Sequence, residues 1–371
     1  MKISQAIFLI VFTLLSSCIV QFIPETEEDK ELLVVEGLIT DIPGVNTVKL
    51  SKSLPLGRKN QAKPLKGCLV AILDDAGHLF NLKETVSGTY VTDPSLFKGK
   101  VGVSYKLRID TRNAFNYLVF ESIPLKLKAV PDIDSLYYEK VLISAGGDGV
   151  RPVEGCQIYL NTGDPSNECR FYRWEYSETW QFRLPYNVPN QVCYITNNSG
   201  IINVRNTSIL AEDKVTRYPL NYISNATDRL KVKYSLLVNQ YSLNEDEFDY
   251  WEKLQTISEE IGGLYDITPS AIPSNIICIN EPSEKVLGYF SVSAVKSKRI
   301  FIKEYFSGGI NLYTSCASDT LKGTGTINGM WMIEDHTGEI PPYKVFTGDK
   351  GCADCTTRGS TTRPLFWDEG K

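Results

Sequence analysis

Two cysteines near the end of the chain, Cys352 and Cys355, have the spacing used in zinc-binding and redox-active sites. Zinc would need further ligands, and neither a second pair of this spacing nor a local pair of histidines accompanies them. A redox pair would call for a helix that begins after the first cysteine, whereas the surrounding residues "ADCTTRGS" are typical of a turn. We therefore expect both cysteines to be structural, with one of them bonded to Cys316.

Histidine is scarce, because His78 and His336 are the two histidines of the chain. They lie far apart in the sequence, so neither a Ser-His-Asp nor a Cys-His arrangement is predicted, and no HExxH zinc motif is present. Glu334, Asp335 and Glu339 could hold a cation, although their spacing matches no established loop motif. A glycosidase that uses only carboxylates remains as the alternative, because that chemistry needs two acids.

The first residues have the pattern of a secretory signal. Lys2 precedes an apolar run over residues 6–15, which is too short for a membrane-spanning helix of about 20 residues. Ser16, Ser17 and Cys18 follow the run and resemble the lipobox of bacterial lipoproteins. The resemblance implies cleavage after residue 17 and a lipid on Cys18. The alternative is an ordinary signal peptide that is cleaved nearby, with Cys18 incidental.

Residues 18–30 are rich in acidic side chains and predict a flexible tether between the lipid and the first domain. The formal net charge of the chain is -5 at pH 7. A negative balance argues against nucleic acid or anionic lipid as the main partner, and we expect no nucleic-acid partner.

If Cys18 carries lipid, eight cysteines remain in the mature chain. An export signal places them in an oxidising envelope, where an even number suits disulfides. The sequence does not choose among the many pairings that eight cysteines allow.

The composition favours strands, because tyrosine, phenylalanine, valine and threonine are abundant while methionine occurs three times. Residues 31–130 contain short segments separated by turn residues, which predict an immunoglobulin-like or prealbumin-like β-sandwich. A domain boundary is expected at Pro131, at the end of "KAVP". The expected strands are Leu32–Asp41, Thr47–Ser53, Cys68–Asp75, His78–Glu84, Gly88–Asp93, Tyr105–Asp110 and Tyr117–Leu125.

Residues 131–371 predict a larger, mainly β domain. "YRWEYSETWQFRL" alternates apolar and polar residues, which indicates a long strand with a buried aromatic face. Glu178 breaks this pattern, because strict alternation places its carboxylate on the apolar face. It is either buried with a cation or a proton, or it marks a bulge that resets the register.

One amphipathic helix is predicted to begin after the capping-box pattern Ser242–Glu245, with Asp246 and Glu247 at the positive end of its dipole. Its apolar stripe is expected to pack on a sheet, with a partner-binding face as the alternative. Farther along, "VLGYFSVSAV" and "KRIFI" predict a hairpin whose turn is "KSKR".

Several quoted segments, "LVVEGLITDIPG", "YRWEYSETWQF", "VNQYSLNEDEFDYWEKLQ", "VLGYFSVSAVKSKRIFI" and "CADCTTRGSTTRPLFW", resemble the Bacteroidota lipoprotein family known as domain of unknown function 4249. The resemblance implies a lipoprotein of the outer membrane whose genes often lie beside those of TonB-dependent transporters. It supplies no catalytic residue, because the family has none assigned. The acidic stretch behind Cys18 resembles the surface-export signals of such lipoproteins and predicts exposure on the cell surface.

Together these observations predict a non-catalytic accessory or solute-binding partner of a TonB-dependent transporter, with no cofactor. The alternative is a surface hydrolase with a carboxylate site. Aromatic residues dominate binding surfaces, so the candidate contact residues are Gly263, Tyr265, Asp266, Trp331 and Trp367.

Overall fold

The computed structural model describes residues 31–53, 63–111, 117–143, 152–260, 272, 274–307 and 316–369. The expected signal peptide and tether, Cys18 included, lie outside these residues, and so do Gly263, Tyr265 and Asp266. The described residues form a mainly β protein with one long helix, which confirms the predicted fold class. No described helix is both long and apolar enough to cross a membrane.

Two six-stranded sheets form the predicted β-sandwich. The first sheet has the order β19 (Val286–Ser293), β1 (Leu33–Thr40), β2 (Thr47–Lys52), β7 (Thr89–Val91) and β6 (Lys83–Val86), with β3 (Lys63–Pro64) paired to β2. The second has the order β18 (Ile276–Cys278), β9 (Val119–Ser122), β8 (Ser104–Asp110), β4 (Leu69–Asp74) and β5 (Leu79–Asn81), with β10 (Leu125–Lys126) on β8. Alternate residues such as Val35 and Leu107 fill the core between the sheets.

The sandwich is completed by strands from late in the chain, so the predicted division at residue 130 is wrong in part. Strand β19 pairs in parallel with β1 along its whole length, and β18 pairs with β9. Periodicity predicts that a segment is a strand but not which distant strand it pairs with. The expected hairpin is also wrong, because β19 and β20 (Val295–Ile302) belong to different sheets and "KSKR" lies inside β20.

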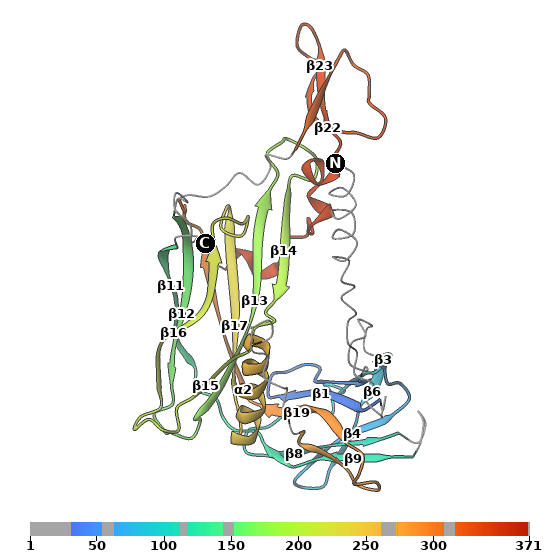
Figure 1. The fold of residues 1–371 in the computed structure, drawn as a ribbon, viewed down its shortest axis with the longest axis vertical. Coiled ribbons are helices and arrows are strands. Elements are labelled where there is room, and N and C mark those ends of the chain that lie inside the picture. Colours follow the sequence, from blue (N-terminus) through green and yellow to red (C-terminus); the bar gives the residue numbers. More distant parts are fainter. Residues whose placement is uncertain are drawn as a thin grey trace, which may run out of the picture.

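Longer strands build the second part and stand beside the sandwich in Figure 1. One sheet has the order β11 (Ile133–Ile143), β12 (Val153–Gly163) and β16 (Lys214–Ser224). The other has the order β14 (Val192–Asn198), β13 (Phe171–Arg183), β17 (Lys233–Ser242) and β20, with β15 (Asn203–Asn206) on β13. A single hydrophobic core runs from the sandwich into these sheets, so the two parts share buried surface.

Glu178 lies in the middle of β13 and is buried, with 6% of its surface exposed. Strand β13 keeps its register with both β14 and β17 across this position, so the bulge is excluded. The carboxylate accepts a hydrogen bond from the Tyr234 hydroxyl at 2.9 Å, and Arg229 Nη1 lies 3.4 Å from the same oxygen. The other expectation, a buried carboxylate paired with a cation, is therefore confirmed.

Helix α2 (Glu245–Glu260) lies across the junction between the sandwich and the long strands (Figure 1). Its predicted capping box is wrong, because Ser242 is the last residue of β17. The Ser242 hydroxyl donates to the Lys128 carbonyl at 2.7 Å and accepts the Ala294 N–H at 3.3 Å. The helix contacts β13, β15 and β19, so its packing against sheets is as predicted.

The C-terminal residues form a small sheet that projects from the body, far from the sandwich (Figure 1). It has the order β21 (Ser318–Lys322), β23 (Tyr343–Thr347) and β22 (Trp331–His336). The chain then returns to the body through three short helical segments, α3 (Lys350–Ala353), η1 (Cys355–Thr357) and η2 (Leu365–Asp368).

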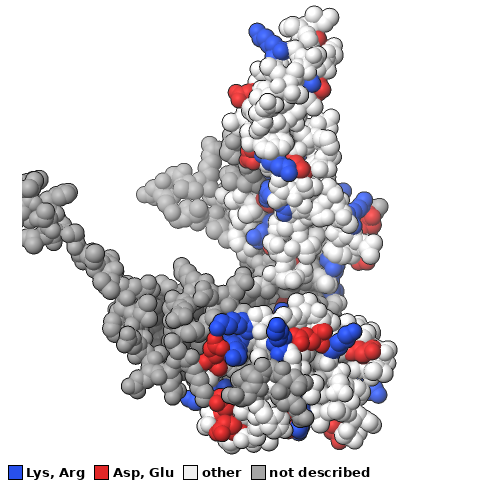
Figure 2. All heavy atoms as spheres, turned by 90° about the vertical axis from the view of Figure 1, so that its right-hand side faces the viewer, with Lys and Arg blue, Asp and Glu red and all other residues white. Residues whose placement is uncertain are grey.

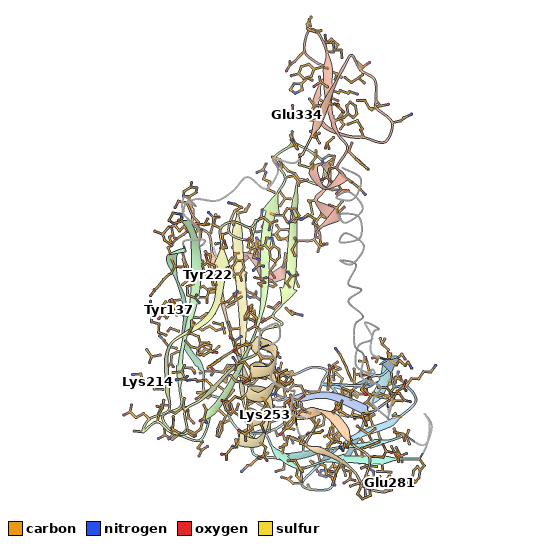
Figure 3. All side chains as sticks on the ribbon, viewed as in Figure 1. Tyr137, Lys214, Tyr222, Lys253, Glu281 and Glu334 are labelled. Carbon is orange, nitrogen blue, oxygen red and sulfur yellow. A yellow bond between two sulfur atoms is a disulfide. The ribbon has the colours of Figure 1, made fainter. Side chains whose placement is uncertain are left out.

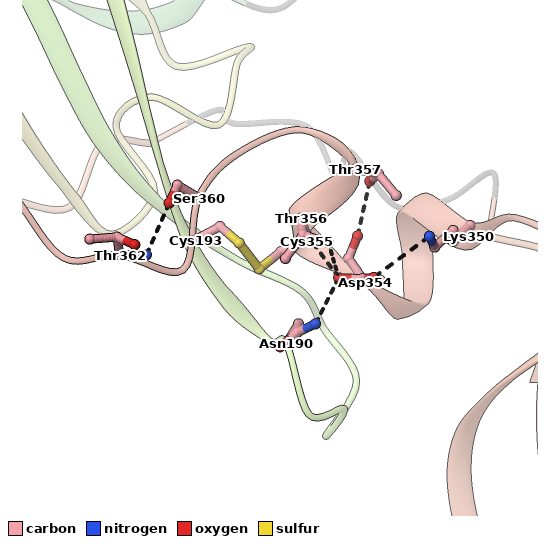
Figure 4. Close-up of a disulfide and its surroundings, with 9 residues drawn as sticks. All are labelled: Asn190, Cys193, Lys350, Asp354, Cys355, Thr356, Thr357, Ser360 and Thr362. Carbon is pink, nitrogen blue, oxygen red and sulfur yellow. Dashed lines mark hydrogen bonds and ion pairs between the residues drawn. A yellow bond between two sulfur atoms is a disulfide. The ribbon is translucent and has the colours of Figure 1, made fainter.

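Disulfides attach this returning segment at two points. Cys316 is bonded to Cys352, which is the expected pairing for one cysteine of the "CADC" pair. Cys355 is bonded to Cys193 of β14 (Figure 4), and the sequence did not predict this partner. Four other described cysteines are free and buried, so an even number does not mean complete pairing: Cys68, Cys156, Cys169 and Cys278.

Candidate functional site

A pocket opens on the outer face of the sandwich, where the β19-β1-β2 sheet meets helix α2. Alternation along β1 turns Val35 into the sandwich core and leaves Glu36 and Leu38 on the opposite face. Register places Glu36 beside Tyr289 and Lys49, and Leu38 beside Ser291 and Thr47. These side chains form the floor of the pocket.

Tyr250 and Trp251 of helix α2 cover this floor, and Arg173 and Glu175 of β13 close one side. The pocket is partly open to solvent and its volume is about 370 Å³, which lies in the range of about 300–1,000 Å³ typical of sites for small molecules. The residues come from β1, β2, β13, α2 and β19, so the pocket depends on the pairing of the late strand β19 with β1.

Arg173 is the most buried charge in the pocket wall, with 6% of its surface exposed. Its guanidinium carbon lies 3.8 Å from the centre of the Trp251 ring and 5.1 Å from that of Tyr241. The guanidinium also forms an ion pair with Glu175, whose other oxygen accepts the Tyr241 hydroxyl at 3.0 Å. Burial lowers the pKa of Arg173, and the charge of Glu247 opposes that shift.

Glu247 lies behind the pocket wall and is fully buried. Loss of hydration raises the pKa of its carboxyl to about 7, while the nearby Ser291, Arg173 and Trp251 act to lower it. Neither carboxyl oxygen has a hydrogen bond of normal geometry to any described residue. Ser291 and Trp251 both line the pocket, so Glu247 adjoins it through these two side chains.

Two polar atoms of the lining are also buried without a hydrogen bond to any described residue: the Trp251 indole N–H and the Tyr289 hydroxyl. Tyr250 lies between them, with its ring centre 4.7 Å from that of Tyr289 and 5.5 Å from that of Trp251. Burial raises the pKa of Tyr289, so its hydroxyl keeps its proton at neutral pH. These two atoms are shielded from solvent, so the polar surface of the pocket comes from its charged lining residues, Glu36, Lys49, Arg173 and Glu175.

Two of the residues predicted as a contact surface, Trp331 and Trp367, lie within the described part of the chain, and they lie on different sheets. Trp331 lies on β22 of the projecting sheet and is 38% exposed. Trp367 is 2% exposed, so its prediction as an exposed contact residue is wrong. The disulfide-bound C-terminal segment presses it onto the β14-β13-β17 sheet, where its indole N–H donates to Gln181 at 3.3 Å and its carbonyl accepts from Lys233 at 2.6 Å.

Two of the three carboxylates suggested as a cation site pair with a histidine instead. Glu334 and Glu339 each contact a ring nitrogen of His336, at 3.1 Å and 2.9 Å. His78, the other histidine, pairs with Asp74 in an exposed turn. Within the part of the chain that the structure describes, no group of three or more His, Cys, Asp or Glu side chains is arranged to hold a metal.

The pocket itself was not predicted as a site, although two of its parts were visible in the sequence. Tyr250 and Trp251 belong to the predicted apolar stripe of the helix, and Arg173 and Glu175 are polar positions of the alternating strand. An apolar stripe that begins with two large aromatic residues indicates such a site only once its contact with the Arg-x-Glu pair of a strand is known.

The fold and the pocket define a mainly β protein in which a sandwich and a set of long strands share an aromatic and polar cavity. The chain belongs to the family described as domain of unknown function (DUF4249), whose model matches residues 20–299. This range includes every residue that lines the pocket, and it ends before Cys316, Cys352 and Cys355. No curated protein matches the chain.

Proposed function

We propose that the protein is a lipid-anchored outer-membrane lipoprotein, exposed on the cell surface, that binds a small solute as a non-catalytic accessory of a TonB-dependent transporter. The pocket between the sandwich and helix α2 is the observation that carries the binding role. It has the volume, the aromatic lining and the few polar groups that are typical of small-molecule sites. The lipobox-like residues that end in Cys18 support the anchor.

The charge distribution supports a solute other than nucleic acid. Figure 2 shows basic and acidic side chains interspersed over the lower part of the face that it draws, without an extended surface of one sign. Nucleic-acid partners select continuous basic surfaces. A mixed surface, together with a pocket that has two basic and two acidic side chains, suits a small molecule instead.

The projecting sheet is the candidate surface for the transporter. Trp331 and Met332 of β22 and Ile340 of the following turn are exposed, and Ile340 is 100% exposed. Aromatic and large apolar side chains of this kind dominate binding energy at protein interfaces. Figure 3 shows Glu334 of β22 well separated from Lys253 of α2, so a partner at this sheet would leave the pocket open to solute.

Detergent extraction and affinity purification of the tagged native protein test the proposal. A TonB-dependent barrel should copurify in near-equal amount. The variant Trp331→Ala should reduce this yield, while Leu365→Ala, at an exposed position outside the projecting sheet, should not. Isolation of the native protein as a lone monomer would refute the role as an accessory.

The lipid anchor has a separate test. The variant Cys18→Ala should be released in soluble form, because no described helix could hold the protein in a bilayer. The variant Cys68→Ala, which changes a buried thiol of the sandwich, is the matched control and should stay with the membrane. Retention of Cys18→Ala in the outer-membrane fraction would show that a protein partner holds it there.

A carboxylate-based hydrolase remains the second candidate, and one observation favours it. The carboxyl of Glu247 has a pKa of about 7, and Glu36 and Glu175 line the adjoining pocket. A general acid works best with a pKa near the working pH. Turnover of a bound glycan by the purified protein, lost in Glu247→Gln, would favour this class over the accessory.

A further inference from the structure

We propose that the pocket between the sandwich and helix α2 binds a free amino acid with a large apolar side chain, held by both its ammonium and its carboxylate. This inference rests on the proposed function, because it names the chemical class of the solute for the same pocket. Its support comes from one pair of opposite charges on the pocket floor and from the apolar surface beside them.

Four charged side chains line the pocket, and two of them already neutralise each other. Arg173 forms an ion pair with Glu175, and the second oxygen of Glu175 accepts the Tyr241 hydroxyl at 3.0 Å. This side of the pocket therefore offers no net charge to a solute.

Glu36 and Lys49 are the other two charges of the lining. They lie directly across from each other on β1 and β2, and both are exposed. Opposite charges in this position can form a cross-strand pair. The two side chains nevertheless form no ion pair or hydrogen bond with each other or with any other described residue. A carboxylate and an ammonium thus lie side by side on the floor, and both are open to a solute.

A zwitterion is the solute that satisfies both groups. The ammonium of an amino acid would pair with Glu36 and its carboxylate with Lys49, through charge-assisted hydrogen bonds. An anion would be attracted by Lys49 and repelled by Glu36, and a cation would meet the reverse. An uncharged solute would gain no ion pair. Charge complementarity of this kind selects among solutes even though each exposed ion pair contributes little affinity.

The apolar part of the lining lies next to these two charges. Leu38 lies on the same face of β1 as Glu36, and Tyr250 and Trp251 cover the floor. Burial raises the pKa of Tyr250, and the charge of Glu36 adds to this shift, so the carboxylate lies close to the aromatic wall. A side chain on the bound amino acid would therefore reach apolar surface. The volume of about 370 Å³ is near the lower end of ligand sites, which suits a single amino acid.

Matched ligands test the proposal with the full-length protein purified in detergent. The probes are phenylalanine and leucine. Their N-acetyl derivatives lack the ammonium, their amides lack the carboxylate, and glycine lacks the apolar side chain. Saturation-transfer NMR and calorimetry should detect phenylalanine or leucine at millimolar concentration or below. Each altered ligand should bind more weakly than its parent by about two- to fivefold or more.

Reversal of the two floor charges locates the binding. Glu36→Lys places two ammonium groups on the floor and Lys49→Glu places two carboxylates there, so either single variant should weaken binding by about tenfold. The double variant again has one charge of each sign and should recover most of the lost affinity. Both positions are exposed, so the melting temperature should change little. Lys253→Glu, at an exposed position of α2 outside the pocket lining, is the matched control and should bind as the unchanged protein does.

The outcomes separate this inference from the proposed function. Four results would overturn the amino acid assignment: no binding of phenylalanine or leucine, equal binding of an N-acetyl or amide derivative, unchanged affinity in both single variants, or no recovery in the double variant. Copurification of a transporter barrel would still stand in that case. Conversely, amino acid binding without a barrel would support the assignment and refute the accessory role.

Discussion

Glu247 should make the stability of the protein fall as the pH rises. Its carboxyl is fully buried, and the loss of hydration raises its pKa from the ordinary value of 4.5 to about 7. The folded state therefore holds this proton more tightly than the unfolded state, so the stabilisation is complete below pH 4.5 and is lost between pH 4.5 and pH 7. Between pH 5 and pH 8 this group should reduce the free energy of unfolding by about 2 to 3 kcal/mol.

Glu247→Gln keeps the shape of the side chain and removes the ionisation. Chemical denaturation at pH 5 and pH 8 measures the free energy of unfolding of the variant and of the unchanged protein. Between these two pH values, the stability of the variant relative to the unchanged protein should rise by about 2 to 3 kcal/mol. Glu252→Gln on the exposed side of the same helix is the control and should show no such difference. If Glu247→Gln kept the full pH dependence of the unchanged protein, Glu247 would be ionised at low cost and the reasoning about its burial would be wrong.

Two further changes test the architecture. The double variant Cys316→Ser and Cys352→Ser opens a loop with a sequence separation of 36. In non-reducing denaturation its free energy of unfolding should be lower by about 2 to 4 kcal/mol. An unchanged midpoint would mean that the bridge does not constrain the unfolded chain. Gly288→Ala should unfold at a clearly lower temperature, because φ is +85° and the added Cβ would lie 2.0 Å from the Val35 carbonyl oxygen. Gly348→Ala has open space around its Cβ, and an equal loss there would contradict this explanation.

The local structure of many segments was predictable, because it depends on neighbouring residues. The alternation of apolar and polar residues correctly predicted β1 and the long strand β13. The helical spacing of apolar residues correctly predicted helix α2. Cys316 was predicted as the partner of either Cys352 or Cys355, and the structure shows that it is Cys352. Partners far apart in sequence were not predictable, as the bond of Cys355 to Cys193 at a separation of 162 shows.

The errors have a common physical cause. A strand pattern gives the faces of β19 but not its neighbour, so its parallel pairing with β1 was missed. Whether an aromatic residue near a chain end is exposed or buried depends on what that end packs against. Trp367 is buried because its hydrogen bonds with Lys233 and Gln181 keep the last helical turn on the sheet. Long-range contacts decide both cases, and no local propensity encodes them.

The same long-range pairing explains why the pocket lies where it does. Strand β19 brings Tyr289 and Ser291 to the outer face of the sandwich, and β20 continues directly into the sheet that contains Arg173. Helix α2 then spans the gap between the two parts, with Trp251 against Arg173 and Tyr250 against Tyr289. Because each wall belongs to a different part of the molecule, a solute held there would contact both parts at once.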